Sequence, residues 1–319
     1  MRALTAAVAV AVIVAILAGA AYWLLMKGGP GGLGGLASNA VKVEGVDLYA
    51  VSSKSTPELT FIEAVIKYEV TAPNIVSLDV GGGELNITAN GVKLLTVTIP
   101  PQKVSGGAHE FRVTGYLENE GISRWWVTHL RNGEETNVSV DGYVSIGLAG
   151  TYVQVPVHDS ARIKTHIFPI HEKLNRELSL GPLGSVKIKE ATITLTGINE
   201  EATNLKAVIS VENDLKIPLV VGDVAYSVTL PDGTKVAEGY VKGLTTIPPG
   251  SSRELTVPVK IDNDAIPKLW YFIVQGRGKA NLTINVWFRL SYGSRTLDIL
   301  KNHPIRIEVT VNAPIMKFK

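Results

Sequence analysis

The chain has 319 residues, with 31 Lys and Arg against 29 Asp and Glu, and it contains no Cys. The missing thiols exclude disulfides, thiolate zinc sites and a cysteine nucleophile. With Arg2 and Lys27 set aside, basic and acidic residues balance at 29 each. A neutral remainder lacks the positive field of a nucleic-acid binder, so we expect no nucleic-acid partner.

Residues 3–26 carry no charge. As a helix they would extend about 36 Å, which exceeds the ~30 Å hydrocarbon core of a bilayer. Ala18-Gly19-Ala20 resembles a signal-peptidase site, but the apolar run continues through Tyr22-Trp23 to Met26, beyond the length of an ordinary signal-peptide core. We predict a single-pass transmembrane anchor over residues 1–27, with a cleaved signal peptide as the alternative.

Small residues recur every four positions within this run, which places them on one stripe of the helix and would let a second helix approach closely. They are Ala7, Ala11, Ala15 and Gly19. These residues are candidates for membrane-helix packing and self-association, and the abundance of alanine throughout the segment is the alternative explanation of the stripe. Residues 28–40 are rich in glycine and contain a literal G-x-G-x-x-G. Because no strand precedes it and Pro30 interrupts it, we interpret this stretch as a tether to the membrane rather than a dinucleotide loop.

Three Asn-x-Ser/Thr sequons follow the tether, at Asn86, Asn137 and Asn281. They are candidate N-glycosylation sites, and such sites are used only outside the cytoplasm. An anchor so close to the beginning of the sequence commonly leaves the following chain outside the cell. We therefore expect an extracytoplasmic ectodomain, although three sequons can also arise by chance.

The ectodomain contains an internal repeat. Matching motifs recur at offsets of 144 to 148 residues. The matched pairs are Val41-Lys42-Val43 with Val186-Lys187-Ile188, Ile99-Pro100-Pro101 with Ile247-Pro248-Pro249, Trp126 with Trp270, and Asn137 with Asn281. Such consistent spacing predicts a duplicated unit. We place the two copies at residues 41–167 and 183–319.

Most segments of each copy alternate apolar and polar residues with period two, as in half-buried antiparallel strands. One apolar face comprises Val138, Val140, Gly142, Val144 and Ile146, and its counterpart comprises Leu282, Ile284, Val286, Phe288 and Leu290. Turn signals such as Asn90-Gly91 separate the short strands. The predicted fold class is all-β: two tandem Greek-key β-sandwiches of the immunoglobulin or fibronectin kind.

One segment of each copy has helical periodicity instead. Residues 264–275 place Ile266, Leu269, Trp270 and Ile273 on one face, with Asn263 as N-cap, and residues 122–133 repeat the pattern. We predict one helix per sandwich, with Trp126 and Trp270 buried and Trp125 partly exposed. Between the copies, Ile170, Leu174 and Leu178 recur every four residues, which predicts a connector helix over 168–182.

The second copy resembles the group 2 late-embryogenesis-abundant domain, also called the water-stress-and-hypersensitive-response (WHy) domain. A strand at 207–211 runs into Asn213-Asp214-Leu215-Lys216-Ile217-Pro218-Leu219, where the family typically has Asn-Pro-Asn followed by apolar-Pro-apolar. The family's small-Gly turn, Pro-rich turn and strand are matched in order at residues 236–239, 247–250 and 255–259. The first copy has Ala72-Pro73-Asn74 at the corresponding site, so each copy departs from the motif at one position.

The resemblance implies a Greek-key sandwich with one helix and no catalytic residues, in proteins associated with desiccation and other stress. The residues themselves offer no competing chemistry. His171-Glu172 opens a zinc-peptidase-like pattern, but Asn175 stands where the second His is required. We predict no catalytic residue, no cofactor and no metal.

These patterns together predict a membrane-anchored envelope protein without enzymatic activity, which protects membranes and neighbouring proteins during desiccation or heat stress. The expected partners are membrane lipid, neighbouring envelope proteins and the chain itself. One alternative is a structural or adhesive surface component that assembles through its sandwiches. Another is a lipid-handling protein. The sequence names neither the partner, the oligomeric state nor the stress that triggers the function.

Overall fold

A computed structural model describes residues 41–70, 78–104, 107–148, 151–165, 167–179, 181–243, 245–292, 295–299, 301–312 and 317–319. Within them, no helix combines the length and the apolar composition needed to cross a membrane. The predicted anchor with its small-residue stripe (Ala7, Ala11, Ala15 and Gly19) and the tether at 28–40 lie outside the described residues.

The described chain is mostly β, with two α-helices, which confirms the predicted class. It divides into two compact units. Unit 2 contains residues 41–165 together with Trp270–Lys279 and Asn312–Lys319, and unit 1 contains His166–Leu269 and Ala280–Val311. The first unit along the sequence is therefore completed by two segments that come more than a hundred residues later.

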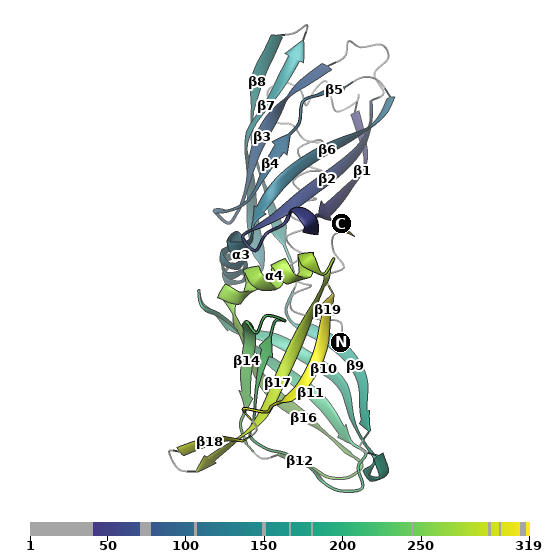
Figure 1. The fold of residues 1–319 in the computed structure, drawn as a ribbon, viewed down its shortest axis with the longest axis vertical. Helices are drawn as coiled ribbons and strands as arrows, with labels where there is room; N and C mark the ends of the chain where they lie inside the picture. Colours follow the sequence, from purple (N-terminus) through teal and green to yellow (C-terminus); the bar gives the residue numbers. More distant parts are fainter. Residues whose placement is uncertain are drawn as a thin grey trace. The chain divides into compact units, whose positions relative to one another are not determined.

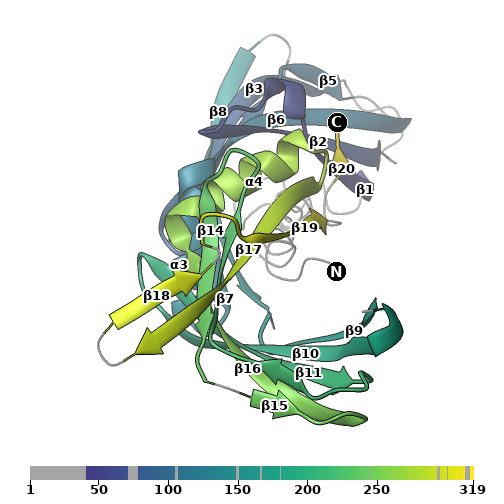
Figure 2. The same cartoon turned by 60° about the horizontal axis from the view of Figure 1, so that its bottom comes forward.

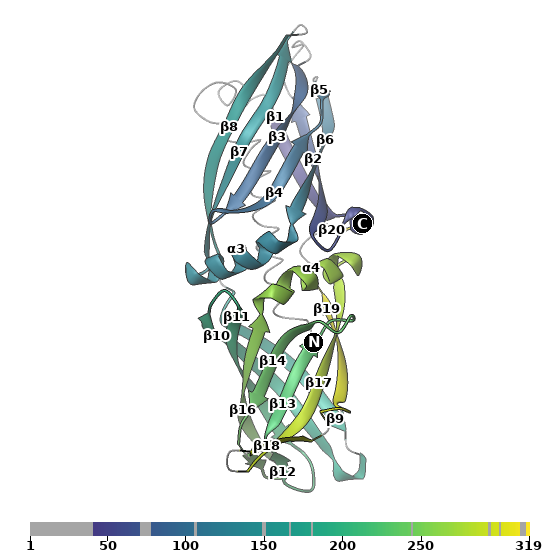
Figure 3. The same ribbon diagram turned by 60° about the vertical axis from the view of Figure 1, so that its left-hand side comes forward.

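Unit 2 is built on a nine-stranded sheet with the order β20-β1-β2-β6-β4-β3-β7-β8, in which β5 also pairs with β3. The strands are β1 (Val41–Ala50), β2 (Leu59–Val70), β3 (Leu78–Ala89), β4 (Val92–Ile99), β5 (Gln102–Val104), β6 (Gly107–Glu118), β7 (Glu135–Leu148), β8 (Thr151–Lys164) and β20 (Lys317–Phe318). The sheet folds over, with β1, β2 and β6 on one side and β3, β7 and β8 on the other (Figures 1 and 3). A short 3-10 helix, η1 (Ser52–Lys54), follows β1.

Unit 1 has a second nine-stranded sheet, with the order β18-β17-β13-β14-β16-β11-β10-β9, in which β19 also pairs with β17. Its strands are β9 (Ile170–Ser179), β10 (Ser185–Ile198), β11 (Ala202–Asn213), β13 (Val224–Thr229), β14 (Lys235–Val241), β16 (Ser251–Asp262), β17 (Lys279–Tyr292), β18 (Arg295–Ile299) and β19 (Ile305–Asn312). β12 (Leu219–Val221) and β15 (Thr245–Ile247) form a separate pair. Figure 2 shows β9, β10, β11 and β16 in one layer, with β14 and β17 crossing in another.

In each unit the two layers are joined by hydrogen bonds, rather than being the two separate sheets that define a simple sandwich. The connection is made by β4 and β6 in unit 2 and by β14 and β16 in unit 1. Strands correspond position by position along the two sheet orders, because β1, β2, β6, β4, β3 and β7 occupy the places of β10, β11, β16, β14, β13 and β17.

The helix α3 (Asn119–Arg131) follows β6 and packs across the ends of β4 and β7 (Figure 3). Its apolar residues recur every three or four positions, and Ile122, Trp126 and Leu130 are buried. Trp125 is buried as well, with 0% of its surface exposed, so the prediction that this ring is partly exposed is wrong. The helix ends at Arg131 and is followed by Asn132-Gly133, where Gly133 adopts a φ of +66°.

The helix α4 (Ile266–Gln275) follows β16 and a 3-10 turn, η3 (Asn263–Ala265). The turn is capped by the carboxylate of Asp262, which accepts a hydrogen bond from the backbone N–H of Asp264. The predicted cap, Asn263, instead uses its side chain to bind Thr203. Trp270 is buried, as the sequence predicts.

The predicted connector helix at 168–182 is wrong. Residues 170–179 form strand β9, which pairs antiparallel with β10 from Ser179↔Ser185 to Ile170↔Ile193, and the 3-10 helix η2 (Gly181–Leu183) makes the turn. Apolar residues four apart lie on one face of a helix, but four is also a multiple of the strand period of two. The spacing of Ile170, Leu174 and Leu178 therefore fits both structures, and pairing with β10 selects the strand.

Candidate functional site

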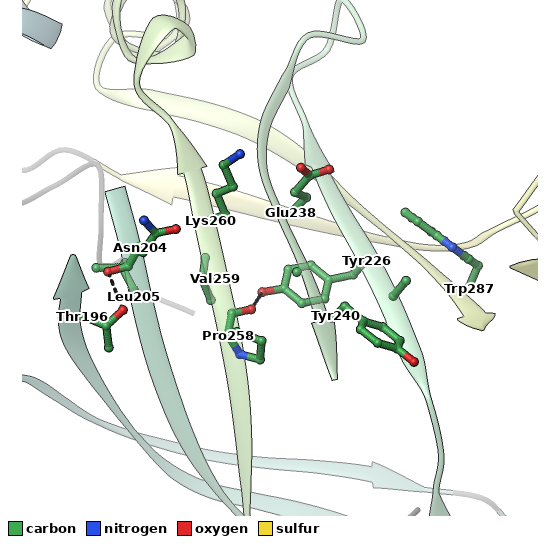
Figure 4. A pocket seen from close by; sticks show the side chains of 12 residues that line it. Thr196, Asn204, Leu205, Tyr226, Glu238, Tyr240, Pro258, Val259, Lys260 and Trp287 are labelled. Carbon is green, nitrogen blue, oxygen red and sulfur yellow. Dashed lines mark hydrogen bonds between the residues drawn. The ribbon is translucent and has the colours of Figure 1, made fainter. Parts of the chain in front are cut away.

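A cavity of about 420 Å³ opens in unit 1 where β14 and β16 separate (Figure 4). Its lining includes the aromatic side chains of Tyr226, Tyr240 and Trp287 and the charged side chains of Glu238 and Lys260. The volume falls within the range of small-molecule sites, and the mixture of rings with a few polar groups is typical of them. This cavity is therefore the candidate binding site of unit 1.

The cavity exists because the ladder between β14 and β16 stops after two residue pairs, Ala237↔Ile261 and Glu238↔Lys260. Two residues beyond Lys260 stands Pro258. The N–H and C=O of one strand residue point to the same neighbour, so at Pro258 only a carbonyl faces β14 and no donor is present. The Tyr226 hydroxyl donates to this carbonyl at 2.7 Å and so replaces the missing ladder bond (Figure 4).

Gly239 makes this arrangement possible. A Cβ atom at this position would lie 2.2 Å from the Pro258 carbonyl oxygen and 2.3 Å from the Tyr226 hydroxyl oxygen. The Tyr226 side chain therefore crosses β14 over the one residue that has no side chain, and it reaches β16 on the far side. The bond between Tyr226 and Pro258 joins residues 32 positions apart, so it leaves no local signal in the sequence.

The charges and donors around the cavity have defined states. Glu238 accepts a hydrogen bond from Lys235 at 2.8 Å, and this bond lowers the pKa of its carboxyl, with Lys260 acting in the same direction. Burial raises the pKa of Tyr226, so its hydroxyl stays protonated at physiological pH. The indole N–H of Trp287 is buried without a hydrogen-bond partner. At neutral pH the site therefore presents one anion, one cation and neutral donors, a set suited to binding rather than to proton transfer.

A second polar centre is buried in unit 2 around His129, which is completely inaccessible. Its Nδ1 lies 2.7 Å from the Thr136 hydroxyl, its Nε2 lies 2.9 Å from the Thr165 hydroxyl, and its ring stacks on Trp125. Because the Thr136 oxygen already accepts the Trp125 indole N–H, its own proton is available for Nδ1. Burial lowers the pKa of His129, and the Glu134 carboxylate opposes this effect.

The same buried pair of side chains anchors the helical segment of each unit. Asn119 accepts a hydrogen bond from the Thr60 hydroxyl at 2.7 Å and donates to the carbonyls of Thr56 and Pro57. Asn263 accepts from Thr203 at 2.7 Å and donates to the carbonyls of Asn199 and Glu200. Asn119 and Asn263 lie 144 residues apart, the spacing of the sequence repeat, but this spacing does not indicate their threonine partners about 60 residues away.

In unit 2 the Thr60 hydroxyl has a further partner, because the Trp270 indole N–H donates to it at 2.8 Å. Gln275, one turn farther along α4, donates to the carbonyls of Ser52 and Ser55. The C-terminal half of α4 is thus bound to unit 2 by both apolar burial and specific hydrogen bonds.

The predicted glycosylation acceptors lie on three different strands. Asn137 on β7 and Asn281 on β17 are exposed, whereas Asn86 on β3 is half-buried and accepts a hydrogen bond from Thr96. Whether they carry glycans stays a prediction. His171 is exposed and lies 3.0 Å from the Thr192 hydroxyl. Among the described residues, no three His, Asp or Glu side chains are grouped as a metal site would require.

Comparison with known proteins gives one family match. Residues 208–312 match the model of the family described as "Late embryogenesis abundant protein" (LEA_2). No curated protein matches the sequence. The matched stretch contains β12 to β19, which include the three strands that carry the aromatic side chains of the cavity, and the whole of α4.

Solved structures give weaker likenesses. A protein from Archaeoglobus fulgidus is 26% identical over 39% of this chain and 98% of its own, with a TM-score of 0.31. Bacteroides uniformis β-glucuronidase 2 is 11% identical over 80% of this chain, and a putative β-galactosidase from Bacteroides fragilis is 10% identical over 86%, with TM-scores of 0.24 and 0.21. The matches span only 26% and 41% of those two enzymes. These TM-scores support no conclusion about function.

The family match thus agrees with the resemblance seen in the sequence motifs of the second copy. LEA_2 domains are linked to stress protection and are generally non-enzymatic. Residues 208–312 of this chain are a LEA_2, or WHy, domain.

Proposed function

We propose that the protein is a non-enzymatic stress-protection protein of the cell envelope, anchored in the membrane by residues 1–27. It carries a second LEA_2-like copy within residues 41–167, in front of the matched domain. The protein acts by shielding membranes and neighbouring proteins during drying or heating. The observation that carries this proposal is the LEA_2 match at residues 208–312.

Two observations support the second copy. Six strands take the same places in the two sheet orders. The buried Thr–Asn anchor then recurs at equivalent positions, at Thr60 and Asn119 in one half and at Thr203 and Asn263 in the other. A shared strand order can arise independently, but a shared order with the same side-chain anchor before the same helix is better explained by duplication.

The protective function is tested by drying a labile enzyme, and separately dye-filled vesicles, with and without the purified chain. We expect more recovered enzyme activity and less leakage than with an equal mass of an unrelated β-protein. If the two copies act together, Asn119→Ala and Asn263→Ala should each reduce protection by about half, because two tethered copies raise the effective concentration of the second contact. Equal recovery with the chain and with the unrelated protein would contradict the proposal.

The topology is tested on intact cells. An external ectodomain is cut by added protease before lysis, and an Asn86, Asn137 and Asn281 to Gln triple variant then has a lower mass if the source glycosylates. Protection from protease until lysis would place the ectodomain inside the cell. This experiment is independent of the drying assays.

Assembly through the sandwiches is a second candidate function, and exposed apolar residues of unit 1 favour it. Leu183, Ile217 and Val220 are 46%, 48% and 55% exposed. A backbone hydrogen bond of 2.9 Å from Lys216 to the Leu183 carbonyl ties the two segments that carry Leu183 and Ile217. Replacing all three by Ser should abolish self-association seen by light scattering if this patch drives assembly.

A further inference from the structure

The edge of β1 in unit 2 is occupied by residues 317–319. Strand β20 pairs parallel with β1 through Tyr49↔Lys317 and Ala50↔Phe318. The pairing is extended by a hydrogen bond of 3.0 Å from the Lys319 N–H to the Ala50 carbonyl. Ser52 then donates both its N–H and its hydroxyl to the Lys319 carbonyl, at 2.9 and 2.8 Å. Three residues thus make a short strand addition of the kind used to bind extended peptides.

The side chains at this edge select two lysines spaced by one residue. Lys317 pairs with Asp47 at 2.5 Å, and Lys319 pairs with Glu63 at 3.3 Å. The Lys319 ammonium also lies 3.7 Å from the centre of the Tyr49 ring, which is a cation–π distance. Positions i and i+2 of a strand project to the same face, so both lysines reach this acidic and aromatic surface together.

Electrostatics agrees with this geometry. The hydrogen bond from Lys317 holds the pKa of Asp47 below its usual value, and the same bond raises the pKa of Lys317. Phe318 lies between the two lysines, so its side chain projects to the opposite face of the strand, and it is half-buried. The recognised pattern is therefore an extended Lys-apolar-Lys segment.

Residues 317–319 are bound weakly to β1, whereas β1 itself is paired with β2 along most of its length. The two ladder pairs are few, and the Lys317 and Lys319 side chains are 60% and 41% exposed. Solvent-exposed ion pairs of this kind contribute about 1 kcal/mol or less each. On its other side β1 pairs with β2 along nine residues, so the edge persists when residues 317–319 leave. An intramolecular segment held so weakly depends on its high local concentration.

We propose that the edge defined by Asp47, Tyr49, Ser52 and Glu63 is an exchangeable strand-binding site for Lys-apolar-Lys segments, and that residues 317–319 of a second copy of the chain can occupy it. The exchange needs no new surface, because each copy carries both the acceptor edge and the donor strand. Two copies that exchange donors form a closed pair with the same contacts as the single chain.

The acceptor half of the proposal is tested with a fluorescent peptide covering Asn312–Lys319. Two acceptors are compared: the full chain shortened by residues 317–319, and the full-length chain carrying Lys317→Glu and Lys319→Glu, in which the covering strand is present but repelled. We expect both to bind the peptide, and the unmodified chain to bind it at least about tenfold more weakly because its own strand competes. Failure of both acceptors to bind would overturn the proposal.

Specificity is tested on the same acceptors. Asp47→Asn should weaken peptide binding about fivefold, and a peptide with Glu in place of both lysines should not bind. The matched control is Glu84→Gln, an exposed acid of β3, a strand that does not neighbour β1 in the sheet order. Equal binding of the Lys and Glu peptides would show that the edge does not select this pattern.

Exchange between copies is tested by mixing a labelled full-length chain with the shortened chain. A one-to-one pair should appear by size-exclusion chromatography and should disappear when the free peptide is added in excess. If no pair forms at concentrations at which the peptide saturates the shortened chain, the second copy is not a donor and this half of the proposal is overturned.

Discussion

The two units share the same buried Thr–Asn anchor, but they differ in the seam, which is the strand pairing that joins their two layers. Asn119 and Asn263 each make three hydrogen bonds of the same kind. Each accepts one from a strand threonine and donates two to backbone carbonyls in the turn that precedes the strand of that threonine. The seams that join the layers differ: β4 and β6 share four residue pairs, whereas β14 and β16 share two. The buried polar anchor is therefore the same in both units, whereas the layers are joined by four backbone pairs in unit 2 and by two backbone pairs and the Tyr226 side chain in unit 1.

The largest expected effect comes from removing the anchor. Asn119→Ala leaves the buried Thr60 hydroxyl without an acceptor for its proton and removes the donor to the Thr56 and Pro57 carbonyls, and it should reduce the stability of unit 2 by about 3 kcal/mol. Asn263→Ala should reduce the stability of unit 1 by a similar amount. Urea denaturation followed by hydrogen exchange separates the two units.

The control for the anchor is Asn281→Ala. Asn281 is exposed and accepts one hydrogen bond from Thr310, so its loss should cost no more than about 0.5 kcal/mol. We expect Asn119→Ala and Asn263→Ala to lose similar amounts of stability. If one of them lost as little stability as the control, the two anchors would not be equivalent.

Gly239→Ala should have the next largest effect, because it disturbs the contact between Tyr226 and Pro258 that joins the layers of unit 1. The new Cβ would lie closer than van der Waals contact to both the Pro258 carbonyl and the Tyr226 hydroxyl, and we expect a loss of about 2 kcal/mol. Gly233→Ala tests a glycine of the same unit whose Cβ meets no atom, although its φ of +85° adds backbone strain. An unchanged melting temperature for Gly239→Ala would show that Tyr226 and β16 move apart at no cost.

The pH dependence of unit 2 should exceed that of unit 1 because of His129. Burial lowers its pKa below the ordinary value of 6.5, so in the window just below pH 6.5 the unfolded chain binds a proton that the folded chain does not. Stability is therefore complete above pH 6.5 and falls as the pH decreases, by at most about 1.4 kcal/mol per pH unit. Denaturation midpoints between pH 5 and 8 measure this slope.

His129→Gln is expected to remove the slope while lowering stability at all pH values, and His171→Gln, at an exposed position, should leave the slope in place. A slope that survives in the His129 variant would assign the pH dependence to other groups.

Tyr226→Phe should have the smallest effect, about 1 kcal/mol, because it removes one hydrogen bond and keeps the ring. The remaining Pro258 carbonyl lies next to an open cavity and can be solvated. Comparison with Tyr116→Phe, an exposed tyrosine of unit 2, isolates the contribution of the hydroxyl. Equal stability of the two variants would mean that the hydroxyl does not close the seam.

Local patterns in the sequence predicted the elements whose signals are local. Alternation along residues 138–146 and 282–290 predicted strands, and the spacing around Trp126 and Trp270 predicted the two helices. The helix predicted at 168–182 failed because a four-residue repeat satisfies both helix and strand periods, and only the partner strand β10 decides between them.

The candidate site lay beyond sequence reasoning because its parts meet only through the sheet. Tyr226, Gly239 and Pro258 belong to three strands, and nothing in their local spacing indicates that one side chain crosses the second strand to reach the third. Trp125 was expected to be partly exposed beside the buried Trp126, yet a hydrogen bond to Thr136 satisfies its indole N–H and lets the ring be fully buried. Whether such a side chain is buried depends on a hydrogen-bond partner for its polar atom, and periodicity does not reveal that partner.

The short ladder between β14 and β16 also determines how deuterium should enter unit 1. Along β14, one edge pairs with β13 through six residue pairs, but the other meets β16 only at Ala237 and Glu238. Amide protons beyond these two residues on the β16 side can exchange without global unfolding, since opening there breaks no ladder bond. Protection factors along β14 should therefore alternate. They should be high where the amide faces β13 and low beyond Glu238, where the amide faces β16. This alternation would report local opening between β14 and β16 near Pro258.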